Sequence, residues 1–213
     1  MQFPNEAIQK RWHQLRAYLQ LELTGLDRET LWTSFNLKGA WKVLFWWVVP
    51  AYLVVIVTFL HKGILPKVYL QAAIGEGIGP HLWNVMGVFG LILVGLSVIY
   101  PRASLISHSA YHVLTNTYSV GCLSLGLIAG QLTTIFLNSE APTPSKLFLA
   151  GIGGALIALV AFNIILWYLA HLMIRQTQGK CLLTQLPKID LRLRVFVALL
   201  VGGIPIVYLL FEK

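Results

Sequence analysis

The stretch from Trp41 to Leu60, WKVLFWWVVPAYLVVIVTFL, decides the fold. A helix rises about 1.5 Å per residue, so about 20 apolar residues cross roughly 30 Å of hydrocarbon. The run has one charged side chain, Lys42, and its tryptophans gather near one end, as aromatic residues do at a membrane interface. We therefore predict a membrane-spanning helix here.

Four further stretches have the same character, and we predict helices at about 82–100, 115–137, 147–174 and 195–211. The composition agrees, since 57% of the 213 residues are hydrophobic, 11% are charged and the mean hydropathy is +0.72. This excludes an ordinary soluble domain, and a nucleic-acid binder with a net charge of +8 would not be so apolar. We predict an all-α fold, a polytopic integral membrane bundle of about five transmembrane helices.

The basic residues predict which way these helices run, because cytoplasmic loops carry an excess of Lys and Arg. With the amino terminus inside and the carboxyl terminus outside, the outer side holds four of the 16 basic residues: Lys62, Lys67, Lys146 and Lys213. The others fall on the inner side. We expect this orientation in a bacterial-type inner membrane or a thylakoid membrane, with anionic headgroups at the basic inner face.

The amino-terminal segment, residues 1–40, differs from the transmembrane domain, residues 41–213. It lacks the apolar core of a cleaved signal peptide, so we expect it to be retained in the cytoplasm. From Pro4 to Leu23 an apolar residue recurs every three or four positions beside basic groups: Ile8, Trp12, Leu15, Leu19 and Leu23, with Lys10, Arg11 and Arg16. This pattern predicts an amphipathic helix that lies on the inner leaflet or docks on the protein's own loops.

Acidic residues are absent from the interiors of the predicted spans, since all eight lie in loops, tails or span ends. A proton-driven pump, an intramembrane aspartyl protease and a di-iron carboxylate bundle each need carboxylates in the core. The sequence argues against these classes and favours a non-enzymatic protein.

Three histidines, His108, His112 and His171, fall near the inner side in this topology. If their imidazoles converge, they have the chemistry to bind a metal, and a pair from two helices has the chemistry to ligate a haem or another tetrapyrrole. Alternatively, these side chains form hydrogen bonds to neighbouring helices or headgroups. Both interpretations stay open at this point.

Helical spacing also predicts one polar stripe, made of Ser104, His108, His112, Thr115 and Ser119. Such a stripe could line the pathway of a channel or transporter for a small solute. Polar residues off the stripe support a different arrangement, in which residues 103–114 form a separate helix at the inner interface and the span starts near Thr115.

Small residues at small-xxx-small spacing predict close helix packing. They are Gly126 and Gly130 in the third predicted span, and Gly151, Gly154, Ala155 and Ala158 in the fourth. The leading hypothesis is therefore a subunit, scaffold or assembly protein that contacts other membrane subunits or a second copy of itself. A His-ligated cofactor protein and a small-solute transporter are the alternatives.

Overall fold

The computed structural model describes residues 5–24, 26, 31, 36–61, 80–137, 146–174 and 181–211. Within these ranges every regular element is a helix, which confirms the predicted all-α class. The elements are α1 (Asn5–Leu23), α3 (Leu37–Leu60), α5 (Pro80–Ile99), α6 (Ser104–Leu137), α7 (Lys146–Ile174), α8 (Leu182–Gln185), the 3-10 turn η1 (Leu186–Lys188), α9 (Leu191–Ala198), the π-helical turn η2 (Leu199–Gly203) and α10 (Ile204–Phe211).

Four of the described helices, α3, α5, α6 and α7, are long and apolar enough to cross a membrane. Three of them begin and end within a few residues of the predicted limits. The third predicted span, 115–137, was too short, because α6 runs without interruption from Ser104. Residues 104–114 are its first turns and do not form a separate helix. Its 34 residues extend over about 51 Å, more than the hydrocarbon thickness requires.

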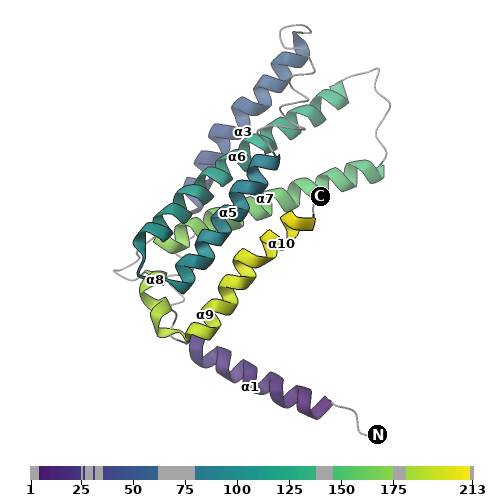
Figure 1. Ribbon diagram of the computed structural model, residues 1–213. Coiled ribbons are helices and arrows are strands. Elements are labelled where there is room, and N and C mark those ends of the chain that lie inside the picture. The colour runs from purple at the N-terminus through teal and green to yellow at the C-terminus, as the bar shows by residue number, and fades with distance from the viewer. Residues whose placement is uncertain are drawn as a thin grey trace.

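Helix α6 is the centre of the bundle, and α3, α5 and α7 all pack against it (Figure 1). The largest group of buried apolar side chains joins α5, α6 and α7 and includes Val94, Leu114 and Leu166. A smaller group holds the start of α3, where Ala40 packs with Tyr118 and Trp167. Buried hydroxyl groups such as those of Ser97 and Thr117 donate hydrogen bonds to carbonyl oxygens four residues earlier in the same helix. These hydroxyl groups therefore have hydrogen-bond partners although they lie in an apolar interior.

The last helical stretch, α9–η2–α10, packs along α5. It is continuous from Leu191 to Phe211, but the π turn divides it into pieces that are each shorter than a span. Two glycines bring the partners close, because a Cβ at Gly95 would lie 3.0 Å from the Ala198 carbonyl oxygen and one at Gly202 would lie 3.4 Å from the Ile92 Cα. Arg194 also donates a hydrogen bond to the last carbonyl of α5, that of Ile99, at 3.2 Å.

Candidate functional site

The three histidines do not form a common metal site. His108 and His112 are exposed on the first turns of α6, whereas His171 is half-buried in the last turn of α7. Within the described part of the chain, no three His, Cys, Asp or Glu side chains are grouped so that they could hold a metal ion. A metal site made by all three imidazoles, which was one of the two interpretations of the sequence, is therefore not found among the described residues. Ligation of a tetrapyrrole by two of them stays a hypothesis.

His171 instead belongs to an aromatic cluster where α6 and α7 meet. Its ring lies 4.3 Å from the ring of Trp167 and 5.3 Å from that of Tyr111, measured between centroids, and its Nδ1 lies 3.0 Å from the Trp167 carbonyl oxygen. The ring of Trp167 in turn packs against that of Tyr118, with their centroids 4.8 Å apart and their planes tilted by 49°. These contacts give the imidazole a packing role between two helices.

The same cluster holds the start of α3. Trp167 Nε1 donates to the Asn36 carbonyl oxygen at 3.0 Å, and the Tyr118 hydroxyl donates to that of Ala40 at 2.9 Å. The first carbonyls of α3 thus receive donors from both α6 and α7. The sequence showed these residues as separate aromatic positions, and nothing in their spacing predicts the partners.

The predicted polar stripe lies on one side of α6 and is largely open. Ser104, His108 and His112 are exposed, and Thr115 and Ser119 are half-buried. Thr115 and Ser119 donate to carbonyl oxygens within α6, and His108 Nδ1 lies 3.0 Å from the Ser104 carbonyl oxygen. The buried polar residues of these turns are Ser107 and Thr117, which are off the stripe. The described residues therefore do not enclose the stripe as the lining of a pathway.

Asn163 of α7 is a buried polar side chain that reaches a neighbouring helix, with 1% of its surface exposed. Its Oδ1 accepts a hydrogen bond of 2.9 Å from Trp83 Nε1 on α5, while its Nδ2 has no hydrogen-bond partner among the described atoms. The glycine at position 121 makes room for it, because a Cβ there would lie 2.6 Å from Asn163 Cγ. The amide thus joins α5, α6 and α7 at one point.

The Asn163→Ala variant is expected to lose about 1–2 kcal/mol of stability, because the half-buried Trp83 N–H then loses its acceptor and a void remains. Thermal unfolding in detergent measures this loss. The exposed Asn116→Ala on α6 is the matched control. In a double-mutant cycle with Trp83→Phe, additive effects would contradict the assigned hydrogen bond.

The two glycine pairs of α6 and α7 have opposite surroundings. On α6, a Cβ at Gly126 would overlap the backbone of Val48 and lie 2.8 Å from Ala51 Cβ, and one at Gly130 would lie 2.7 Å from Val55 Cβ. All three contacted residues belong to α3. Close approach of α3 and α6 therefore depends on these glycines.

On α7 the glycines have open surroundings among the described residues. A Cβ at Gly151 or Gly154 would meet no described atom within 4 Å, and the same holds for Gly153. Ala158 is exposed, as is the neighbouring Ile157, at 73%. The side chain of Ala155 lies outside the described residues. This surface, Gly151, Gly154, Ile157 and Ala158, is called the α7 face below.

Helix α1 is attached to the rest of the chain through Asp190. The Tyr18 hydroxyl donates to Asp190 Oδ2 at 2.9 Å, and the Asp190 N–H donates to Glu22 Oε2 at 3.0 Å. The other carboxylate oxygen, Oδ1, caps α9 by accepting from the Arg192 N–H. The bond to Asp190 raises the pKa of Tyr18, and the bonds from Arg192 and then Tyr18 lower that of Asp190. Asp190 is therefore ionised at neutral pH, and the contribution of this contact is lost as the pH falls through the lowered pKa of Asp190 or rises through the raised pKa of Tyr18.

No family model, curated protein or solved structure matches this chain.

Proposed function

We propose that this chain is a non-enzymatic integral membrane subunit, a scaffold or assembly protein, whose α7 face binds another membrane-embedded helix. The partner is a different subunit or a second copy of the chain. The observation that carries the proposal is the contrast between the filled glycines of α6 and the open glycines of α7.

The physics of helix association in lipid supports this assignment. Lipid tails are as apolar as leucine side chains, so the hydrophobic effect does not hold helices together there, and close packing across small residues does. The α6 glycines use this packing within the chain. The same residue pattern on α7 meets no described helix of the chain, so its packing capacity is available to a partner.

We further propose five spans with the amino terminus inside, in a bacterial inner or thylakoid membrane. The stretch from Leu191 to Phe211 has 21 residues, which at about 1.5 Å each reach roughly 31 Å, enough to cross the hydrocarbon. Three basic residues lie at helix ends: Lys38 at the start of α3, Arg102 after the end of α5 and Arg192 at the start of α9. The Trp167–Asn36 bond joins the start of α3 to α7, and the Arg194–Ile99 bond joins the start of α9 to the end of α5. We take these ends to lie on one side of the membrane. This side is the inner one by the positive-inside rule.

Reporter fusions test the span count. A phosphatase active only outside the cytoplasm, joined after Lys213, is expected to be active, and the same reporter joined after Lys188 is expected to be inactive. Equal activity at both positions would show that α9–η2–α10 does not cross.

The proposed assembly role is tested by the mass of the particle extracted in mild detergent. We expect protein mass well above the 23.8 kDa of one chain. Consistent recovery of a lone monomer would contradict the proposal.

A further inference from the structure

The apolar face of α1 is uncovered. Trp12 is 66% exposed, Ile8, Leu15 and Leu23 are each about half exposed, and Leu19 is half-buried. These residues recur at helical spacing and so share one face. All of them except Ile8 border a hollow of about 740 Å³, whose described lining comes from α1 alone and also includes Arg16 and His13. An exposed apolar face on a helix marks a surface that binds another protein or a membrane.

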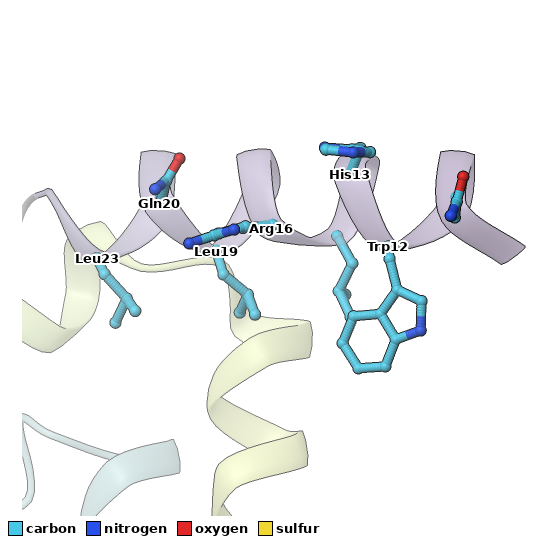
Figure 2. Close-up of a pocket in the computed structure, with 8 residues that line it drawn as sticks. Trp12, His13, Arg16, Leu19, Gln20 and Leu23 are labelled. Carbon is cyan, nitrogen blue, oxygen red and sulfur yellow. The ribbon is translucent and has the colours of Figure 1, made fainter.

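The attachment through Asp190 decides which way this face points. Figure 1 shows α1 leading away from the base of α9, crosswise to the bundle. In Figure 2, Trp12, Leu19 and Leu23 leave α1 on the side where the last helical stretch lies, and His13 is on the other side. That last stretch carries exposed apolar side chains from its first residue, Leu191, onward through Phe196 and Leu199. The uncovered face of α1 therefore points to the side on which the exposed apolar side chains of the last helical stretch lie, where we expect the hydrocarbon of the membrane.

The basic side chains of α1, three against its two acidic ones, match one kind of cover. Lys10, Arg11 and Arg16 are exposed on it, and Lys188 and Arg192 are exposed beside its attachment point. Near an anionic leaflet each basic side chain raises the bound-to-free ratio about 5-fold. A neutral protein surface would cover the apolar residues but would leave this charge without a counterpart.

From these observations we infer that α1 lies on the inner leaflet and binds anionic phospholipid, with Trp12 and Leu19 in the acyl boundary and its basic side chains at the headgroups. This inference rests on the amino-terminus-inside arrangement proposed above. Asp190 links the bound helix to the first turn of α9. The position of α1 on the membrane surface therefore also fixes the depth at which the last helical stretch begins.

Site-specific fluorescence in lipid nanodiscs tests this with the full chain. Both native cysteines are buried, so a polarity-sensitive probe attaches to an introduced Trp12→Cys or, as the matched control on the opposite face, to Gln14→Cys. In bilayers containing phosphatidylglycerol, the probe at position 12 is expected to be quenched by brominated lipid and shielded from iodide. The probe at position 14 is expected to show the reverse.

Two further conditions separate lipid charge from other covers. Replacing Lys10, Arg11 and Arg16 by glutamine should lower the bound-to-free ratio of α1 about 100-fold in the same bilayers. Pure phosphatidylcholine should lower it similarly for the unchanged helix. Equal quenching at positions 12 and 14 would overturn the inference. So would shielding of position 12 from both quenchers, since protein would then cover it. Particle mass and reporter activity are separate readouts, so failure here is distinguishable from failure of the proposed function.

Discussion

The Gly126→Leu variant is expected to detach α3 from α6 and to abolish the native bundle. A leucine at this position cannot be accommodated by a rotamer change, because its Cβ already overlaps the backbone of Val48 and lies 2.8 Å from Ala51 Cβ. Overpacking against movable side chains costs about 1–3 kcal/mol, and contact with backbone costs more. Helix α3 packs mainly against α6, and 11% of the residues in its apolar window are buried.

Thermal unfolding in detergent and the yield of folded protein measure this effect. Gly126→Ala is expected to destabilise in the same direction, because the clash starts at Cβ. Gly203→Leu is the control, since a Cβ there meets no described atom within 4 Å. An unchanged melting temperature for Gly126→Leu would show that α3 and α6 do not pack as described.

The Gly154→Leu variant is expected to have the opposite effect, with native folding and loss of assembly. A Cβ at Gly154 meets no described atom, so leucine adds no clash within the chain. It does push apart any helix packed on the α7 face, where close approach needs a small residue. We expect the association constant to fall at least about tenfold, which corresponds to about 1.4 kcal/mol.

Native-mass measurement and thermal unfolding of the same preparation read these two effects separately. Gly203→Leu again serves as the control, because it places the same side chain in open surroundings on a different helix. If Gly154→Leu unfolds the chain, the glycine serves the chain's own packing. If the variant assembles like the wild type, the α7 face does not bind the partner.

Hydropathy was sufficient to locate the four long helices, but it could not place their polar ends. A window of apolar residues stops where the hydrocarbon stops, whereas a helix continues as long as its backbone hydrogen bonds do. This is why 115–137 fell short of α6, whose first turns hold Ser104, His108 and His112. The four-residue spacing of these side chains is typical of one face of an α-helix, and it predicts a helix that begins before Thr115.

Partners across the bundle were beyond the reach of sequence patterns. Depth along a helix follows from residue counting, but the direction in which a side chain points around the bundle depends on the helices packed against it. His171 and His108 fall on the same side in the predicted topology, yet His171 packs on Trp167 and Tyr111. Asn163 and Trp83 are 80 positions apart and no spacing rule joins them. The small residues of α6 and α7 have the same spacing in the sequence. Only the helices packed against them show that these glycines of α6 are in contact with α3 and those of α7 with no described atom.

The mass of the particle released from native membranes by mild detergent tests the central claim most directly. The account predicts a particle heavier than one 23.8 kDa chain for the wild type and for Gly203→Leu, and a folded monomer for Gly154→Leu. A wild-type chain that leaves the membrane as a folded monomer, or a Gly154→Leu particle as heavy as the wild type, would contradict it.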